Sequence, residues 1–558
     1  MAIEKIIVEV IKYALIYIAE EMGVILRKTA FSPNIRDRLD FSCAILAPNG
    51  DLVAQAEHIP VHLGSMVVGA KNIIKWINEH EMDLEAGDVI LSNDPYIVGT
   101  HLNDVMLLKP VFYKDEIVSY LVNKAHHVDI GGKVPGSISV DAESLYEEGI
   151  VIEPIKIVEK NVVGKDLLRK IMDNIRTPEY FKGDIMAQIA SLKTGETRLM
   201  ELISKYGHEV LYRSYNEIIG YTERYTRNVL GKLISRYNAV GEYTATDYLE
   251  SRKYGLLKIN VRIVLAKDNI LVDYSGSSIQ VKEPLNAVYG VTVAATTYAL
   301  KTIIDPDMPM NQGFYRVVSI NAPKGSILNP EPPAPVAGGN LETSQRIVDV
   351  VHLALSKAFP DRVPAASCGT MTNVLLGGSN WAFYETIGCG SGARPSSDGV
   401  DGVHTNMTNT LNTPIEIAER EYPILFVAYE LRRDSCGPGR YRGGLGITRA
   451  FKVLEDNVVL TIFSEREKLR PWGLAGGGSG VPSKHFIVRG NDVIYIGSKS
   501  TVVLKRNDVV YINTPGGGGY GDPCDRDNES IKRDLVEDRI SLEYVKENYG
   551  YCMDKTIL

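Results

Sequence analysis

The sequence lacks the cysteine pattern of a disulfide-stabilised or zinc-finger protein. Its six cysteines are scattered over 558 residues, and no two of them stand in CxxC spacing. Small disulfide scaffolds and structural zinc sites both need cysteines at short, regular spacing. We therefore expect neither a disulfide framework nor a zinc finger, and thiols that stay reduced in the cytosol.

An excess of positive charge is also missing. The chain has 61 lysines and arginines against 69 aspartates and glutamates, which gives a formal net charge of -8. Proteins that bind nucleic acids or anionic membranes usually present a strongly basic surface to the phosphates. We therefore expect neither nucleic acid nor membrane as a partner.

No apolar run is long enough to cross a bilayer. The stretch from Ile6 to Leu26 is apolar, but Glu9, Lys12 and Glu20 are among the charged residues that interrupt it. A membrane-spanning helix needs about 20 predominantly apolar residues. The N-terminus also shows no signal-peptide pattern. We expect an amphipathic helix over residues 2–29 and a cytoplasmic protein.

Glycine is abundant, yet the usual nucleotide-binding motifs are missing. The sequence has no GxxxxGK[ST] before a helix, and no GxGxxG after a strand with an acidic residue following. A GxSxG nucleophile elbow is missing as well. The chain therefore shows neither a phosphate-binding loop nor a dinucleotide fingerprint.

A predicted β-hairpin carries most of the chemistry. Val105–Tyr113 and Ile117–Val122 are rich in β-branched and aromatic residues, which favour strands. Between them, Lys114–Glu116 is a short polar stretch typical of a turn.

Polar side chains stand at the open end of this hairpin. With a three-residue loop centred on Asp115, Asp104 at the start of the first strand lies opposite His126 at the end of the second. With a two-residue loop the register slips by one, and His126 faces Asn103. Opposed residues have Cβ atoms about 5 Å apart. With His101 just before the first strand, two imidazoles and a carboxylate would converge, which suits a divalent transition metal.

The alternative interpretation is a polar strand end whose histidines bond to water or backbone. Two further histidines, His58 and His62, stand nearby in the sequence. They could line the same pocket, but each by itself is more typical of a core residue or of one behind the ligands.

The rest of the sequence predicts an α+β, multi-domain fold with mixed helix and antiparallel sheet. Residues 164–240 are rich in helical periodicity, and from Gly241 the apolar period changes to two. Near the C-terminus, short strands alternate with glycine-rich turns, which indicates an all-β region. We predict four domains, at 1–163 (metal site, α/β), 164–240 (helical), 241–415 (α/β) and 416–558 (β-rich).

Seven stretches, in order over essentially the whole chain, resemble the hydantoinase B/oxoprolinase family. They are SPNIRDRLDFSCAI, AQAEHIPVHLGSM, GDVILSNDPYIVGTHLNDV, AHHVDIGGKVPGS, GDIMAQIA, HTNMTNTLNTPIE and TPGGGGYGDP. The family includes the B-type component of N-methylhydantoinase, the C-terminal part of 5-oxoprolinase, caprolactamase and the acetone carboxylase alpha subunit.

The resemblance implies a division of labour between two subunits. An ATP-binding hydantoinase A-type partner phosphorylates a small-molecule substrate, and the B-type component holds a metal and completes the reaction in a hetero-oligomer such as A2B2. Carried over by motif, the metal ligands are Asp40, His101, Asp104 and His126. For Asp40, an ion pair with the neighbouring arginines is the alternative.

The resemblance further implies hydrolysis of a cyclic amide, such as a hydantoin, 5-oxoproline or another lactam. A Mn, Zn or Fe ion would lower the pKa of water, and His127 or Asp129 would act as general base. Two alternatives stay open. One is a ketone carboxylase subunit like that of acetone carboxylase, and the other is a metal-free scaffold subunit.

Overall fold

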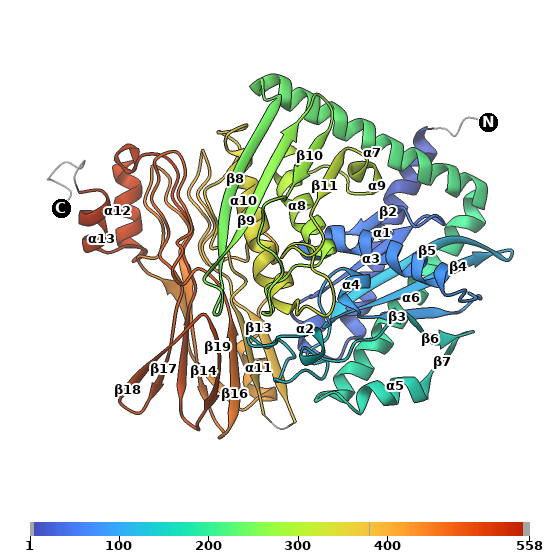
Figure 1. Cartoon of the computed structure of the whole chain (residues 1–558), viewed down its shortest axis with the longest axis horizontal. Helices are drawn as coiled ribbons and strands as arrows, with labels where there is room; N and C mark the ends of the chain where they lie inside the picture. Colours follow the sequence, from blue (N-terminus) through green and yellow to red (C-terminus); the bar gives the residue numbers. More distant parts are fainter. Residues whose placement is uncertain (1–4, 379, 551–558) are drawn as a thin grey trace. The chain divides into compact units, whose positions relative to one another are not determined.

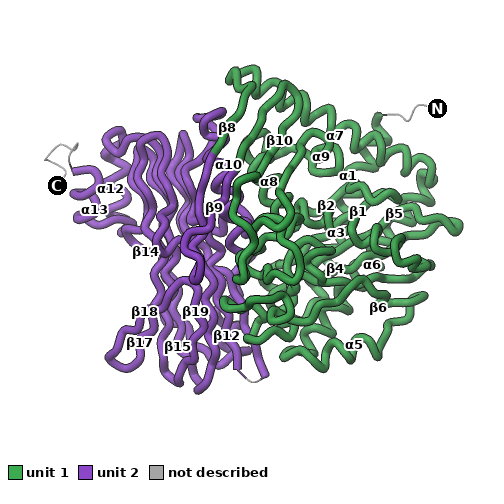
Figure 2. Tube along the Cα trace, in the orientation of Figure 1, with its two compact units in different colours: residues 1–244, 261–340 green, residues 245–260, 341–558 purple. Residues whose placement is uncertain are grey.

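The computed structural model describes residues 5–378 and 380–550, drawn in Figure 1. It has a mixed α+β fold built from helices and mostly antiparallel sheets, which confirms the predicted fold class. The chain divides into two compact units, coloured in Figure 2. Unit 1 is Met1–Thr244 with Val261–Asn340, and unit 2 is Ala245–Asn260 with Leu341–Leu558. The four-domain division stays a prediction.

A seven-stranded antiparallel sheet forms the centre of unit 1. Its strand order is β2-β1-β5-β4-β3-β6-β7, and the predicted hairpin lies in the middle as β4 and β5. The strands are β1 Phe41–Leu46, β2 Leu52–Ala56, β3 Val89–Ser92, β4 Asp104–Tyr113, β5 Glu116–His126, β6 Ile155–Glu159 and β7 Val162–Val163.

Helices surround this sheet and the second sheet of unit 1. The predicted helical segment contains α5 Lys165–Met172, α6 Pro178–Tyr206 and α7 His208–Tyr237. The other helices are α1 Lys5–Thr29, α2 Pro33–Arg36, α3 Pro60–Glu79, α4 Pro95–Val98, α8 Tyr289–Ile304 and α9 Gln312–Tyr315. Among the described residues, no helix combines the length and the apolar character needed to cross a membrane.

The second sheet has the order β11-β10-β9-β8, and its β10–β11 pair is parallel. It comprises β8 Gly241–Glu250, β9 Leu256–Leu265, β10 Ile270–Asp273 and β11 Val318–Asn321. The chain passes from one unit to the other within β8 and again within β9. The change to a period of two at Gly241 therefore marks a real strand start.

Neighbouring residues of β5 contact helices on opposite faces of the sheet. The Lys124 ammonium donates to the Ser65 hydroxyl of α3 at 3.1 Å. The Asn123 side chain instead donates to the Gln188 carbonyl of α6 at 2.8 Å. Because successive side chains of a strand alternate between faces, His126 lies on the α3 face with Lys124.

The loop of the β4–β5 hairpin is shorter than the three-residue loop considered from the sequence. Tyr113 pairs directly with Glu116, so only Lys114 and Asp115 lie between the strands. Both have positive φ, 50° and 67°, as the common two-residue hairpin turn requires.

A β-bulge nevertheless keeps Asp104 opposite His126. The pairing passes from Val111 with Ser119 to a shifted register nearer the tip, which leaves Val118 as an extra residue on β5. The bulge offsets the shorter loop. The predicted pairing is therefore confirmed, although the loop that was to produce it is different.

Unit 2 is β-rich, as predicted for the C-terminal region. Its two sheets have the orders β13-β12-β16-β19 and β14-β15-β20-β17-β18. The strands are β12 Asn373–Gly377, β13 Ala382–Thr386, β14 Ile424–Arg432, β15 Gly446–Val453, β16 Val458–Phe463, β17 Lys484–Arg489, β18 Asp492–Ile496, β19 Lys499–Leu504 and β20 Val509–Asn513. The helices are α10 Ser344–Leu355, preceded by a π-helical turn over Gly339–Thr343, α11 Ile415–Glu421, α12 Asn528–Val536 and α13 Leu542–Asn548.

The glycine-rich stretches of unit 2 do more than form turns. In the extended segment Pro515–Gly519, successive N–H groups donate to carbonyls of different neighbouring segments, with Gly516 and Gly519 returning to the same one; the acceptors are Val481, Gly444, Ala366 and Gly478. A repeat of three residues is that of a polyproline II helix. A Cβ on Gly517 would lie 1.9 Å from the Ser391 carbonyl oxygen. Only glycine fits there, and the predicted turn is corrected to a bundled extended segment.

Unit 2 also contains a disulfide. Cys368 and Cys389 are bonded to each other, with their Cα atoms 6.0 Å apart. The Cys368 N–H donates to the carbonyl of Gly390, which draws the two segments together. The expectation that the thiols stay reduced is wrong for this pair, because spacing along the sequence does not show which distant segments lie side by side.

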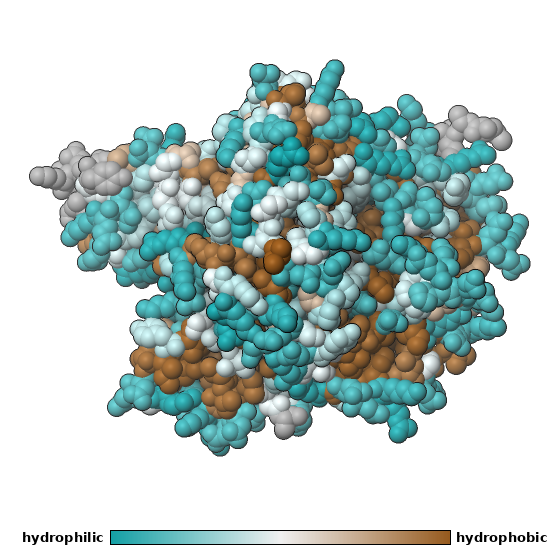
Figure 3. Space-filling model, viewed as in Figure 1, coloured by the Kyte–Doolittle hydropathy of each residue, from teal (hydrophilic) through white to brown (hydrophobic). Residues whose placement is uncertain are grey.

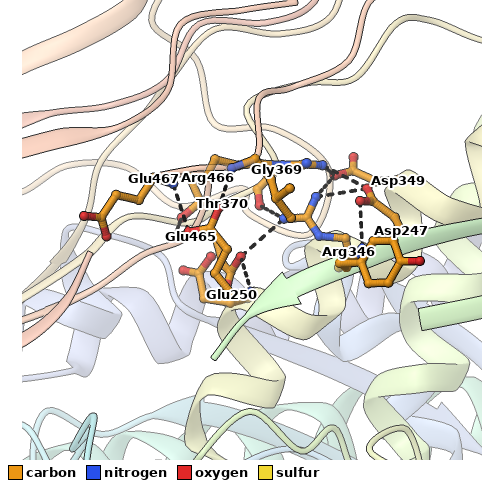
Figure 4. A network of polar contacts seen from close by, with 12 residues as sticks. Asp247, Glu250, Arg346, Asp349, Gly369, Thr370, Glu465, Arg466 and Glu467 are labelled. Carbon is orange, nitrogen blue, oxygen red and sulfur yellow. Dashed lines mark hydrogen bonds and ion pairs between the residues drawn. The ribbon is translucent and has the colours of Figure 1, made fainter. Parts of the chain in front are cut away.

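A buried ionic network joins three elements of unit 2, as Figure 4 shows. The Asp349 Oδ2 atom accepts from Arg346 of α10 at 2.9 Å and from Arg466, just after β16, at 2.6 Å. Asp247 of β8 accepts from the same two arginine nitrogens at 3.2 and 3.1 Å. Both arginines are at most 1% exposed. Each buried charge thus has opposite charges in contact with it.

Candidate metal centre

Three buried side chains converge at the open end of the β4–β5 hairpin. His101 Nε2 lies 3.1 Å from Asp104 Oδ1 and 3.1 Å from His126 Nδ1. The remaining distance, from His126 Nδ1 to Asp104 Oδ1, is 3.2 Å. All three residues are at most 3% exposed. Among the described residues, this is the one set of at least three His, Cys, Asp or Glu side chains whose ligand atoms are close enough to share a metal ion.

This triangle fits a divalent transition metal. Imidazole and carboxylate ligands bind zinc at about 2.0–2.2 Å, which places neighbouring ligand atoms about 3 Å apart. The donor set of two imidazoles and one carboxylate is accepted by zinc, manganese and iron alike. Three atoms that bear lone pairs and contact one another are explained most simply by a cation that all of them can bind.

The electrostatics of the cluster also suit a ligand role. Burial by itself raises the pKa of Asp104, but the neighbouring imidazole of His101 outweighs it and holds the pKa well below the usual range. Burial lowers the pKa of His126. For His101, burial also lowers the pKa, and the Asp104 carboxylate more than reverses that effect. Asp104 therefore stays ionised, which metal binding requires.

Local structure explains how His101 reaches the cluster. The Asp94 carboxylate accepts the N–H of Tyr96 and caps the short helix α4. Gly99 ends this helix with a φ of 83°, a left-handed conformation that glycine adopts readily. The chain then turns, and the N–H of Asp104 donates to the carbonyl of His101 at 3.0 Å. Both side chains are thereby held at the start of β4.

His62 stands directly behind Asp104. Its Nε2 atom lies 3.4 Å from Asp104 Oδ2, and its Nδ1 atom lies 3.0 Å from the Ser42 hydroxyl. A hydroxyl that donates to Nδ1 leaves the imidazole proton on Nε2, facing the carboxylate. His58 instead contacts Glu20 at 3.1 Å. Of the two extra histidines, only His62 touches the cluster.

Asp40 lies beside the cluster, but its carboxylate is not part of the triangle. Its backbone carbonyl accepts the N–H of His126 at 3.0 Å. Its negative charge raises the pKa values of His101 and His126. The role of Asp40 as a metal ligand therefore stays a prediction.

His127 lies on the opposite face of the sheet from His126. Its Nε2–H donates to the Gln188 side-chain oxygen of α6 at 3.0 Å, and its ring packs against Phe181 at 4.8 Å. Burial lowers the pKa of His127, which keeps the imidazole neutral. The structure does not bring this residue to the triangle, because adjacent strand residues point to opposite faces.

Asp129 organises the loop that follows β5. Its carboxylate accepts from the N–H groups of Gly131 and Gly136 at 3.0 Å each. It also accepts from the N–H and the guanidinium of Arg176, at 3.2 and 3.0 Å. With its oxygens bonded in this way, Asp129 fits a loop-stabilising role better than that of a general base.

Two buried ionisable residues near the cluster were missed in the sequence. Glu148 is 1% exposed, although its stretch is typical of a solvated patch. Its carboxylate accepts from the N–H groups of Val336 and Ala337, and burial raises its pKa to about 7. Burial likewise lowers the pKa of Lys124 to about 7. Neither position carries a motif that could have revealed its burial.

The sequence matches the family model described as Hydantoinase B/oxoprolinase over residues 4–523. The chain therefore belongs to this family, and the resemblance found in its motifs is confirmed.

Three relatives place the chain more closely. It is 53% identical over 546 residues to an uncharacterized protein of Methanocaldococcus jannaschii, covering 98% of this chain and 96% of that one. It is 32% identical to the B component of a putative D-/L-hydantoinase of Pseudomonas sp. (strain NS671), which is named as a subunit, covering 98% and 95%. It is 36% identical to 5-oxoprolinase of Dictyostelium discoideum, covering 93% of this chain but only 40% of that longer protein.

Two solved structures share the fold. The ATP-dependent caprolactamase from Pseudomonas jessenii superposes with a TM-score of 0.92 at 28% identity, covering 100% of this chain and 98% of that one. Acetone carboxylase in its nucleotide-free form gives a TM-score of 0.90 at 18% identity, covering 98% and 79%. At that identity the second likeness concerns the fold alone.

Proposed function

We propose that this chain is the metal-dependent hydrolytic subunit of an ATP-dependent complex that opens a cyclic amide. The observation that carries this proposal is the buried triangle of His101, Asp104 and His126 in a member of this family. Relatives named as a hydantoinase subunit, 5-oxoprolinase and caprolactamase support the substrate class, which is a hydantoin, 5-oxoproline or another lactam.

Amide hydrolysis explains why such a centre would be needed. Resonance makes an amide carbonyl a poor electrophile, so phosphorylation of its oxygen by a partner would activate the carbon for attack. A bound Mn, Zn or Fe ion supplies a Lewis acid that lowers the pKa of water to about 7. In this chain, the ionised Asp104 and the two imidazoles would hold the ion, and His62 would orient Asp104.

The proposal includes an ATP-binding A-type partner subunit. The hydantoinase relative, itself named a subunit, matches this chain along 95% of its length. In 5-oxoprolinase the matched part is 40% of a longer chain. A separate subunit would supply what the rest of that chain supplies, in a hetero-oligomer such as A2B2, and ATP would be used there.

The test is to purify the chain with its A-type partner and to measure bound metal and ATP-dependent ring opening together. We expect about one metal ion per chain, and loss of both metal and activity in His101→Ala and His126→Ala. His80→Ala, a change at an exposed histidine, serves as the control. Full activity in a variant that has lost its metal would refute the metal role. Bicarbonate-dependent carbon–carbon bond formation would assign the complex to the carboxylases instead.

A further inference from the structure

Arg432, at the end of β14 in unit 2, is a half-buried arginine with no carboxylate partner in the part of the chain that the structure describes. Its Nη1 atom donates to the backbone carbonyls of Pro482 and Thr514, at 2.7 and 3.0 Å. Burial lowers the pKa of Arg432 to about 10, and no neighbouring acid offsets that effect. The guanidinium is nevertheless charged at neutral pH. In the same unit, Arg442 and Arg526 each contact two aspartates.

Arg432 borders a cavity of about 680 Å³ that unit 2 forms by itself. Arg470 and Lys484 also line this cavity, and neither makes an ion pair within the described residues. Lys484 lies over the Tyr495 ring, with its Nζ atom 4.8 Å from the ring centroid. The one acidic residue in the lining is Glu467, which accepts the N–H of Ser498 at 2.9 Å. Positive side chains therefore outnumber negative ones around the cavity.

A desolvated charge without a counter-charge costs stability, so its presence at a cavity calls for a partner. The Nε and Nη2 atoms of Arg432 donate no hydrogen bond within the described chain. Together they form the planar fork that binds a carboxylate or a phosphate through two parallel hydrogen bonds. The cavity also has the volume typical of small-molecule sites, which is about 300–1,000 Å³.

We propose that this cavity binds a small molecule through an oxyanion group, a carboxylate or a phosphate, held by Arg432 with Arg470 and Lys484. The site lies on side chains other than those of the metal centre, and it does not depend on the function proposed for that centre.

Isothermal titration calorimetry of the full chain tests this, with inorganic phosphate in one arm and glutarate in the other. Chloride keeps the ionic strength constant, because salt screens exposed charges. We expect saturable binding of at least one probe to one site per chain. The arm with the higher affinity identifies the group that the site prefers.

Lys484→Gln and Arg470→Gln each remove one exposed positive charge, and each should weaken binding by about 10-fold. Arg432→Lys keeps the charge but removes the fork, so it should weaken binding at least as much. Arg506→Gln, an exposed arginine outside the cavity, is the matched control and should leave the affinity unchanged. The proposal is overturned if neither probe binds saturably, or if the three cavity variants bind as the control does.

Discussion

At the scale of single residues, the candidate metal centre depends on how one carboxylate is held. Asp104 presents Oδ1 to His101 and His126, and Oδ2 to His62. A hydrogen bond to the second oxygen fixes the orientation of a carboxylate ligand and raises the affinity of a site for its metal. His62 is therefore a positioning residue in the proposed centre.

His62→Leu should lower the affinity for a divalent metal by about 10–100-fold, the usual effect of losing such a partner. The affinity is measured by competition with a chelator, and the absorption spectrum of the cobalt-loaded protein reports any change in ligand geometry. His58→Leu, a change in the same sequence stretch that leaves the cluster untouched, is the control. Equal affinities of the two variants would remove His62 from the centre.

A second prediction at this scale concerns pH. His485 is 2% exposed, and burial lowers its pKa from 6.5 to about 4. As the pH falls below 6.5, the unfolded chain takes up this proton before the folded chain does, so the folded state loses stability. Between pH 6.5 and 4 the loss is about 3 kcal/mol, and above pH 6.5 it is zero.

Urea titrations of the wild type and of His485→Gln at pH 7 and pH 4 measure this effect. The substitution should remove the His485 part of the acid sensitivity, so the stability difference between the two proteins should change with pH. A difference that is the same at both pH values would show that His485 takes up no extra proton on unfolding.

At the scale of elements, some structure follows from sequence patterns and some does not. The β4–β5 hairpin was predictable because β-branched runs flank a polar turn. The start of α3 at Pro60, before the predicted Ser65, could have been found from proline's preference for the first helical turn. The ionic network could not be foreseen, since Asp247 and Arg466 are separated by 219 residues and only the topology brings them together.

The extended glycine segment gives a prediction at this scale. Gly517→Ala should destabilise unit 2 by about 3 kcal/mol or more, because its Cβ would lie 1.9 Å from a backbone oxygen that cannot move away freely. In Gly497→Ala the nearest atom would be 3.5 Å away, which is ordinary contact. Thermal unfolding should therefore show a large decrease in Tm for the first variant and a small one for the second. Similar Tm values would contradict the close packing of this segment.

At the scale of the whole molecule, each compact unit has its own buried core and its own buried polar cluster. Figure 3 shows that one face of the molecule is mostly hydrophilic, with apolar patches between the polar residues. In unit 2, alternate residues of β14 expose apolar side chains, namely Leu425, Val427, Tyr429 and Leu431. The two units can therefore be perturbed and followed separately.

Arg466→Met tests the contribution of the ionic network to unit 2. The change leaves Asp247 and Asp349 with one guanidinium in place of two, and breaking such a buried pair costs about 3–5 kcal/mol. Amide hydrogen exchange should become faster in residues 341–550, whereas β4 and β5 should keep their protection. Unchanged exchange around α10 would show that the network adds little stability.

The extra residue in β5 has a consequence for the tandem histidines. Removing Val118 would move every later residue of β5 one place along its partner, so that His127 would take the place opposite Asp104 and turn toward α3. The site would still receive an imidazole. One residue more after Val118 would put Ala125 in that place, with a methyl group where the ligand atom had been. A hairpin that ends in two consecutive histidines therefore tolerates shortening by one residue but not lengthening.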